Sequence, residues 1–252
     1  MINYPKFGQT LKDKVILITG ASDGIGKAVA IACAKQGAKV ILSGRSKAKL
    51  NQTYDEISSS CKKTEAIIYH LDLLKLDDKA ADLLTGGIYK EFGRLDGLVH
   101  NAAILGNLSP FEQIPTQSWQ NVFQVNVHAP FILSKFCLPL LLQSKAPSII
   151  FTGSGMGKTA SAYWSSYSAS KFANESMTQV LALELEMKGI KVNMVDPLVV
   201  RTKMRALAFP AEDPNTLPAP EQITEAYIYL LSEDSLGISK QRLNAWVKKI
   251  RV

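Results

Sequence analysis

Near its start the chain reads Lys14-Val15-Ile16-Leu17-Ile18-Thr19-Gly20-Ala21-Ser22-Asp23-Gly24-Ile25-Gly26. The apolar, β-branched run at 14–19 is typical of a strand that is buried on both faces of a parallel sheet. Glycines in the following turn let the backbone approach a pyrophosphate, and the next helix offers unpaired N–H groups and a positive dipole to it. The alternative is an ordinary tight turn. Because the turn joins the first strand and first helix of an alternating chain, dinucleotide binding is favoured.

Strand and helix patterns alternate along the rest of the chain. Strands are expected at 39–43, 65–71, 97–100, 148–152, 191–195 and 242–247, and helices at 26–36, 47–61, 79–92, 116–143, 167–188 and 220–231. The helix at 116–143 is expected to bend at Pro130 and Pro139, because proline lacks a backbone donor. This order implies right-handed crossovers. We predict an α/β, single-domain Rossmann fold over residues 1–252, with a parallel, seven-stranded, doubly wound sheet that has helices on both faces.

A second informative pattern is Tyr167-Ser168-Ala169-Ser170-Lys171. On a helix, residues four apart share one face, with Cβ atoms roughly 5–6 Å apart. A neighbouring ammonium lowers the pKa of a phenol, so the pattern predicts that Tyr167 exchanges protons nearer neutral pH. The spacing alone is common, and its weight depends on the motifs that accompany it.

Composition bounds the class of function. The chain has 252 residues, a net charge of +7 and no apolar run near the roughly 20 residues that span a bilayer. Its positive charge fits a solubilising surface or an acidic ligand, such as a phosphorylated cofactor, and no nucleic-acid recognition module is visible. Three scattered cysteines, Cys33, Cys61 and Cys137, and the absence of a secretory signal predict reduced thiols in the cytoplasm. No cluster of residues has metal-ligand spacing, so no metal is expected.

Taken together and in order, the motifs resemble those of the short-chain dehydrogenase/reductase family. The residues that carry this resemblance are Thr19–Gly26, His100–Ala103, Asn126, Ser154, Tyr167, Lys171 and Pro197–Thr202. Within the family, the stretches 21–26, 95–101 and 209–214 look like those of the bacterial YciK-type oxidoreductases, which are treated as oxoacyl-carrier-protein-reductase-like. The similarity covers essentially the whole chain.

The resemblance implies catalytic roles for four residues. Tyr167 would be the general acid/base, and Lys171 would lower its pKa and hydrogen-bond the nicotinamide ribose. Ser154 would polarise the substrate carbonyl, and Asn126 would hold a water that links Lys171 to solvent. Each has a plainer alternative: Asn126 could be a buried polar brace, Ser154 a turn former and Lys171 part of a solvated helix face.

The end of the second strand indicates which cofactor binds. NAD-specific Rossmann proteins usually carry an acidic residue there, whereas this chain has Ser43-Gly44-Arg45-Ser46. We expect NADP(H) rather than NAD(H), with Arg45 and Ser46 at the 2′-phosphate. Alternatively, Arg45 merely begins a polar helix. The resemblance implies further cofactor contacts at Gly20, Ser22, Asp23, Gly24, Ile25, Gly26, Asp72, Leu73, Asn101, Ala102, Ala103, Tyr167, Lys171, Pro197, Val200 and Thr202.

Three positions depart from the family pattern. Ala103 and Leu198 stand where glycine is usual, so the adenine ribose could be crowded and the loop over the nicotinamide could differ. Gly153 replaces a frequent serine, with little effect expected. The substrate pocket should lie under a lid at about 198–220. Its candidate apolar walls are Met156, Trp164, Leu207 and Phe209.

The expected function is an NADP(H)-dependent oxidoreductase that acts on a carbonyl or secondary alcohol. An acyl-carrier thioester, a steroid, a quinone and a small ketone all remain open as substrates. A catalytically weak cofactor-binding regulator or scaffold is the alternative, and the complete set of catalytic residues argues against it. By analogy with the family, a homo-oligomer (dimer or tetramer) is expected, with the long helices at its interface.

Overall fold

One parallel sheet forms the centre of the protein. The structure is a computed structural model that describes residues 10–61 and 64–246. The sheet has seven parallel strands, as predicted, and their order in the sheet is β3-β2-β1-β4-β5-β6-β7. The strands are β1 (Val15–Thr19), β2 (Lys39–Gly44), β3 (Ala66–His70), β4 (Gly97–His100), β5 (Ser148–Thr152), β6 (Lys191–Asp196) and β7 (Arg242–Asn244). The final strand predicted at 242–247 is therefore shorter than expected, and residue 247 lies outside the described residues.

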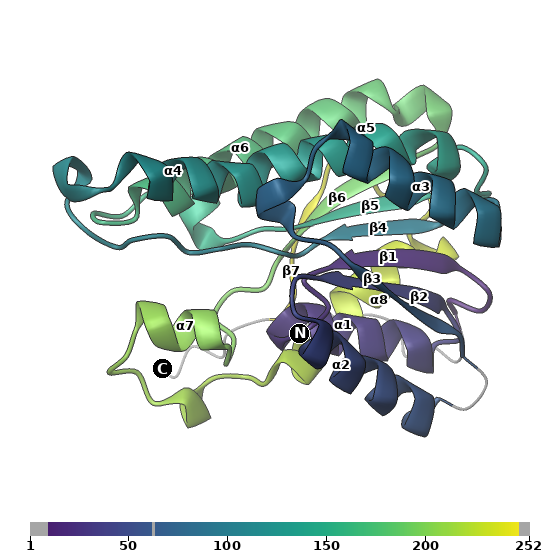
Figure 1. Cartoon of the computed structure of the whole chain (residues 1–252), viewed down its shortest axis with the longest axis horizontal. Helices are drawn as coiled ribbons and strands as arrows, with labels where there is room; N and C mark the ends of the chain where they lie inside the picture. The colour runs from purple at the N-terminus through teal and green to yellow at the C-terminus, as the bar shows by residue number, and fades with distance from the viewer. Residues whose placement is uncertain (1–9, 62–63, 247–252) are drawn as a thin grey trace.

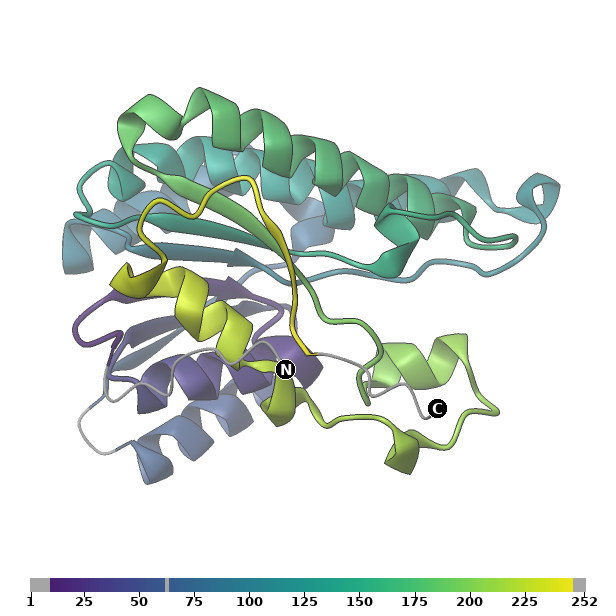
Figure 2. The ribbon, with the colours of Figure 1, turned by 180° about the vertical axis from the view of Figure 1, so that it is seen from behind.

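Helices cover both faces of this sheet. Figure 1 shows α3, α4, α5 and α6 on one face and α1, α2 and α8 on the other, and Figure 2 shows the same layers from behind. The helices are α1 (Gly24–Lys35), α2 (Lys47–Ser60), α3 (Asp78–Phe92), α4 (Thr116–Phe123), α5 (Ala129–Leu141), α6 (Ser165–Glu184), α7 (Lys203–Ala208) and α8 (Glu225–Leu231). Strand β1 pairs with both β2 and β4. The direction in which successive strands are added to the sheet therefore reverses between β1 and β4. Ligands bind at the carboxyl ends of the strands at such a switch point.

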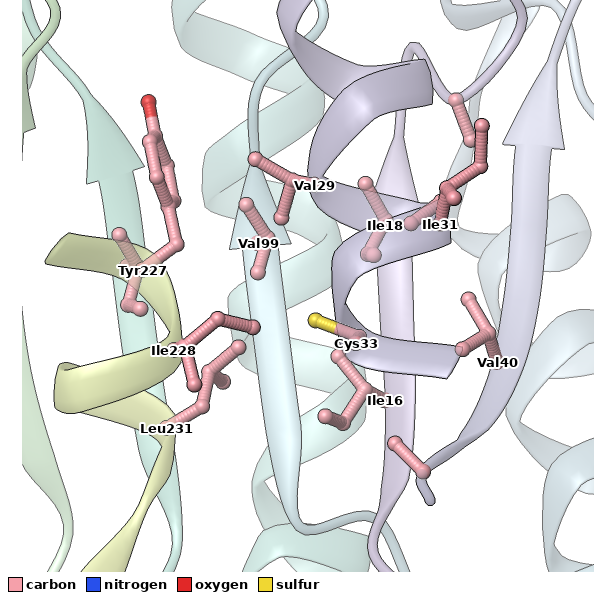
Figure 3. Packing of buried hydrophobic residues seen from close by; sticks show 14 of the residues in the cluster. Ile16, Ile18, Val29, Ile31, Cys33, Val40, Val99, Tyr227, Ile228 and Leu231 are labelled. Atoms are coloured by element: carbon pink, nitrogen blue, oxygen red, sulfur yellow. The ribbon is translucent and has the colours of Figure 1, made fainter. Parts of the chain in front are cut away.

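Two hydrophobic clusters, one on each face, hold the layers together. Alternate side chains of β1 point to opposite faces, so Ile16 and Ile18 belong to one cluster and Leu17 to the other. In Figure 3, Val29 of α1 and Leu231 of α8 reach the same face of β1 and β4 as Ile16 and Ile18. The rigid sheet that results fixes the positions of the loops at its carboxyl edge.

The long helix predicted at 116–143 is interrupted at a different place from the one expected. It divides at a π-helical turn, Gln124–His128, rather than at a proline. Pro130 lies in the first turn of α5, where a helix does not need the missing N–H, and Pro139 lies inside α5. A π-helical turn often marks a functional position, and this one contains Asn126.

The segment between β6 and α8 is less irregular than expected. It contains α7 and a short 3-10 turn at Pro214–Thr216. Thr202 caps the start of α7, because its hydroxyl accepts a hydrogen bond from the N–H of Arg205 (3.1 Å). With only six residues, α7 has too little periodicity to be recognised from sequence.

Candidate active site

A large cavity lies at the carboxyl edge of the sheet. Its volume is about 1150 Å³. Its walls come from the turns that follow β1, β2, β4, β5 and β6 and from α6 and α7. The predicted site residues that line it are Gly20, Ser22, Asp23, Gly24, Ile25, Arg45, Ser46, Asp72, Leu73, Asn101, Ala102, Ala103, Ser154, Tyr167, Lys171, Pro197, Val200 and Thr202. Gly26 and Asn126 do not line it.

The glycine turn after β1 has the shape that a bound phosphate group requires. Gly20 and Gly24 adopt φ values of +71° and +53°, which a side chain would strain. A Cβ on Gly20 would lie 2.9 Å from Nδ2 of Asn101, so the floor of the turn leaves no room for one. At Gly26, a Cβ would meet the carbonyl oxygen of Gly20 at 2.2 Å. Gly26 therefore allows α1 to pack against the turn, rather than facing the cavity.

Basic residues surround the nucleotide end of the cavity. Lys49 and Lys203 lie 2.7 and 3.0 Å from one carboxylate oxygen of Asp23. Burial alone would raise the pKa of Asp23, but hydrogen bonds from these lysines and from the N–H of Gly24 lower it to about 2. Arg45 is exposed at the rim, directly after β2. Sequence reasoning missed Lys49, although it lies one turn into the helix that Ser46 caps.

Ser154, Tyr167 and Lys171 lie together in the middle of the cavity wall. The first turns of α6 bring Tyr167 and Lys171 to its buried face, with exposures of 8% and 4%. The hydroxyls of Ser154 and Tyr167 share a hydrogen bond. Nζ of Lys171 lies 5.7 Å from the centroid of the Tyr167 ring and donates to the carbonyl of Thr152 (2.8 Å). The spacing of Tyr167 and Lys171 thus places both groups at one point of the site.

The prediction that Tyr167 has a lowered pKa is wrong for this structure. Burial raises that pKa to about 12, the bond to Ser154 opposes the rise, and the charge of Asp196 adds to it. Burial also lowers the pKa of Lys171 to about 8, against the effect of Asp196. Desolvation is the largest effect on both groups because both are enclosed by protein. At neutral pH, Tyr167 is therefore a phenol that can donate a proton.

Asn126 acts as a brace. Its side chain accepts a hydrogen bond from the N–H of Ile104 (2.9 Å) and donates to the carbonyl of Ile104 and to Oγ of Ser170 (both 3.0 Å). This arrangement matches the buried-brace alternative of the sequence. It ties the loop after β4 to α6, one residue before Lys171.

The family departures at Leu198 and Gly153 have distinct structural consequences. Leu198 has φ +57°, so the backbone keeps the left-handed conformation that glycine usually supplies, while a leucine side chain lines the cavity. At Gly153, a Cβ would lie 2.5 Å from Sδ of Met194. A side chain at position 153 would therefore require Met194 to move, and the expectation that glycine has little effect here stays a prediction.

A buried ionic group behind Ser154 was not predicted. Nη2 of Arg242, on β7, lies 2.5 Å from Oδ2 of Asp196 and donates to the carbonyl of Ser154 (3.0 Å). Arg242 also forms an ion pair with Glu175 of α6. The sequence signals are weak: Asp196 is a charged residue at the end of a buried strand, and Arg242 lies in a short strand of mixed polarity.

Within residues 10–61 and 64–246, no group of three or more His, Cys, Asp or Glu side chains could hold a metal ion. Across the same ranges, no helix combines the length and apolar character needed to cross a membrane.

Comparisons with known proteins agree with this geometry. A family model described as short chain dehydrogenase matches residues 14–213. The oxidoreductase YciK of Escherichia coli K12 is 43% identical over 234 residues, which cover 93% of this chain and 92% of that protein. A short-chain dehydrogenase from Shigella flexneri, crystallised with NADP, superposes with a TM-score of 0.92 at 42% identity, covering 95% of this chain and 99% of that one.

A second solved structure, a short-chain dehydrogenase from Escherichia coli CFT073 crystallised with NADPH, also has a TM-score of 0.92 at 42% identity. It covers 96% of this chain and 100% of its own. Both structural neighbours share the fold over nearly their entire length. The chain belongs to the short-chain dehydrogenase/reductase family.

Proposed function

We propose that this protein is an NADP(H)-dependent oxidoreductase that interconverts a carbonyl group and a secondary alcohol. The observation that carries the proposal is the hydrogen-bonded pair of hydroxyls on Ser154 and Tyr167, which line the large cavity above Lys171. Two hydroxyl groups that face one substrate oxygen can stabilise the charge that develops on it and transfer a proton. No metal is needed for this chemistry.

Residues of the cavity fit NADP(H). The left-handed glycines at 20 and 24 leave room for a pyrophosphate, and Arg45 and Lys49 supply cations beside the end of β2. The NADP and NADPH in the two related crystal structures support the same assignment. When bound, this cofactor donates or accepts the hydride of the reaction. Arg45, Ser46 and Lys49 would bind the 2′-phosphate, because this end has cations and hydroxyls in place of an acidic residue.

The protein's own residues supply the proton chemistry. Because the pKa of Tyr167 is raised to about 12, its phenol remains protonated and is ready to donate to a developing alkoxide. Ser154 polarises the same oxygen through its hydroxyl. The ammonium of Lys171 favours the phenolate that remains after transfer. This protonation state suits carbonyl reduction at neutral pH.

A lid over residues 198–220 completes the proposed site. Lys203, the first residue of α7, forms an ion pair with Asp23 in the glycine turn. This contact joins the lid to the nucleotide end of the cavity. We expect bound cofactor to order the segment further, because its phosphates would lie beside the same lysine.

The exposed faces of α5 and α6 support a homo-oligomer. Phe131, Phe172 and Leu183 are apolar side chains with 55%, 43% and 58% exposure. Large exposed apolar groups on neighbouring helices favour burial against another copy. Light scattering after gel filtration would test this. Localisation in the cytoplasm, which the free cysteines support, also remains a prediction.

The test of the function is oxidation of NADPH with a panel of ketones, aldehydes, diketones and 3-oxoacyl thioesters. We expect turnover with at least one carbonyl class, and loss of about 10²-fold or more of kcat in Tyr167→Phe. Tyr89→Phe, which removes the hydroxyl of an exposed tyrosine on α3, serves as the control. Saturable NADPH binding without turnover of any carbonyl would instead favour the regulator or scaffold.

A further inference from the structure

An aromatic wall lies beside the reactive phenol. Trp164 precedes α6, and its ring lies 5.9 Å from that of Tyr167 in an edge-on arrangement. Phe209 follows α7, and its ring lies 5.6 Å from that of Trp164. Both side chains line the cavity. Two segments far apart in sequence thus place aromatic rings next to the proton donor.

The ring of Phe209 is held in place by an ionic pair. The guanidinium carbon of Arg205 lies 3.7 Å from the centroid of the Phe209 ring. Arg205 in turn binds both carboxylate oxygens of Glu212, at 2.6 and 2.8 Å. A guanidinium that is fixed by a bidentate carboxylate stacks on an aromatic face with little loss of further freedom. Phe209, which is 38% exposed, is therefore positioned by its contacts with Arg205 and Trp164.

The rest of this end of the cavity is mainly apolar. Its other lining residues are Ile104, Leu105, Gly106, Asn107, Leu108, Met156, Leu198, Val199, Met204, Leu207 and Ala208. The amide oxygen of Asn107 accepts a hydrogen bond from Ser118 (2.6 Å), and Arg205 is paired with Glu212. Among the described residues that line this end, the guanidinium of Arg205 is therefore neutralised by Glu212, while the ammonium of Lys171 donates to the carbonyl of Thr152. The basic residues Arg45 and Lys49 lie at the opposite, nucleotide end.

The apolar and aromatic lining of this end favours some ligands over others. Transfer of a charged group into such a chamber would cost free energy without an ionic partner to offset it. Ring systems bind well beside aromatic side chains, in offset or edge-to-face arrangements. Leu198 adds a further apolar side chain to the lining, at a position where relatives usually have glycine. Flat, uncharged groups are favoured over long flexible ones.

We propose that the substrate is a neutral ketone, or the corresponding secondary alcohol, whose carbonyl is part of or attached to an apolar ring, and that Trp164 and Phe209 bind this ring. The inference rests on the oxidoreductase function proposed above and narrows its substrate class. Carboxylated ketones are disfavoured because they are charged. Acyl-carrier thioesters are disfavoured because their acyl groups are long and flexible and lack a ring.

The experiment compares four probes by NADPH oxidation: α-tetralone, 2-decanone with the same number of carbons, 4-acetylbenzoate and acetoacetyl-coenzyme A. We expect kcat/KM for α-tetralone to exceed that for each of the others by about tenfold or more. Phe209→Leu should raise KM for α-tetralone by about tenfold while changing KM for 2-decanone by less than about twofold. Trp164→Leu should act in the same direction.

Control measurements distinguish failure of the ring inference from failure of the proposed oxidoreductase function. Phe111→Leu removes an exposed aromatic ring outside the cavity and should leave all four probes unchanged. The dissociation constant for NADPH and the melting temperature report whether each variant is folded. If the acyclic or charged probes are reduced at least as well as α-tetralone, and Tyr167→Phe abolishes that activity, the ring inference is overturned while the oxidoreductase function stands. If no carbonyl is reduced, both fail.

Discussion

Arg242 and Asp196 form an ionic pair directly behind the proposed catalytic serine. Their closest atoms, Nη2 and Oδ2, are 2.5 Å apart, and the same Nη2 donates to the backbone carbonyl of Ser154. Arg242 belongs to the last strand and Asp196 ends the strand beside it. The pair with Glu175 extends the link to α6. The last strand therefore braces both the serine and the helix that carries Tyr167.

Removal of this arginine should destabilise the protein and slow turnover. Arg242→Met leaves a carboxylate that is only 5% exposed without its cation, and loss of one partner of a buried ion pair costs about 3–5 kcal/mol. Urea denaturation measures the change in the free energy of unfolding. We expect kcat to fall more than KM for NADPH rises, because Arg242 does not line the cavity. Lys135→Met breaks an exposed pair with Asp78 and should cost only about 0–1 kcal/mol. Equal losses of unfolding free energy in Arg242→Met and Lys135→Met would contradict the role of Arg242 as a brace.

The charge of Asp196 should set the alkaline limit of carbonyl reduction. Lys171 has a pKa of about 8, which burial lowers and Asp196 raises, while Lys158 also faces the carboxylate. Above this pKa, Lys171 loses its charge and no longer favours the phenolate of Tyr167. In Asp196→Asn the pKa of Lys171 falls further, so the pH at which kcat declines should move lower.

A pH profile of kcat with saturating NADPH checks this shift. Asp55→Asn, on the exposed face of α2, makes the same chemical change away from the site and should leave the profile in place. An unchanged or higher alkaline limit in Asp196→Asn would refute the electrostatic role.

Cofactor preference should depend on Arg45. In Arg45→Ala we expect KM for NADPH to rise about tenfold or more, because a hydrogen bond to a charged group contributes about 1.5–3 kcal/mol. KM for NADH should change little, since it lacks the 2′-phosphate. Steady-state kinetics with both cofactors measure the difference. Lys47→Ala removes a neighbouring exposed cation outside the cavity and is the matched control. Similar increases for NADPH and NADH would exclude Arg45 as the discriminating residue.

Backbone strain at Leu198 should lower the free energy of unfolding of the protein. A β-branched residue is especially unfavourable at positive φ, so Leu198→Val should lower the free energy of unfolding by about 1 kcal/mol or more. Leu198→Gly should match or exceed the stability of the original chain, because glycine adopts φ +57° without strain. Leu83 is 63% exposed in the middle of α3, and there Leu83→Gly should be less stable than Leu83→Val. There, glycine costs about 1 kcal/mol and valine less. Chemical denaturation of all four variants decides between the two orders.

Much of the fold was predictable because its information is local. The runs that form β1 and β4 are mainly apolar and buried over their whole length, which is typical of strands covered on both faces. Glycines at 20 and 24 could be assigned to a tight turn because few other residues tolerate it. Helix α7 and the π-helical turn at Asn126 were missed, since each is too short to produce a clear period.

The electrostatics of the site could not be predicted in the same way. A four-residue spacing predicted that Lys171 would lower the pKa of Tyr167, but burial has the larger effect and raises it. The ionic group of Arg242, Asp196 and Glu175 joins positions 46 and 67 residues apart along the chain, so no local pattern announces it. The approach of Met194, on the next strand, to the backbone of Gly153 is likewise a contact that the sequence does not reveal.

The sequence by itself determined the order of the strands and helices, the glycine turn and the spacing of Tyr167 and Lys171. These follow from steric and hydrogen-bonding rules that act between near neighbours. Only the tertiary structure decided which groups are desolvated, which charges meet and which rings enclose the cavity. Desolvation and Coulomb energies depend on distances in space, and the fold brings together residues such as Ser154 and Arg242 that the chain keeps far apart.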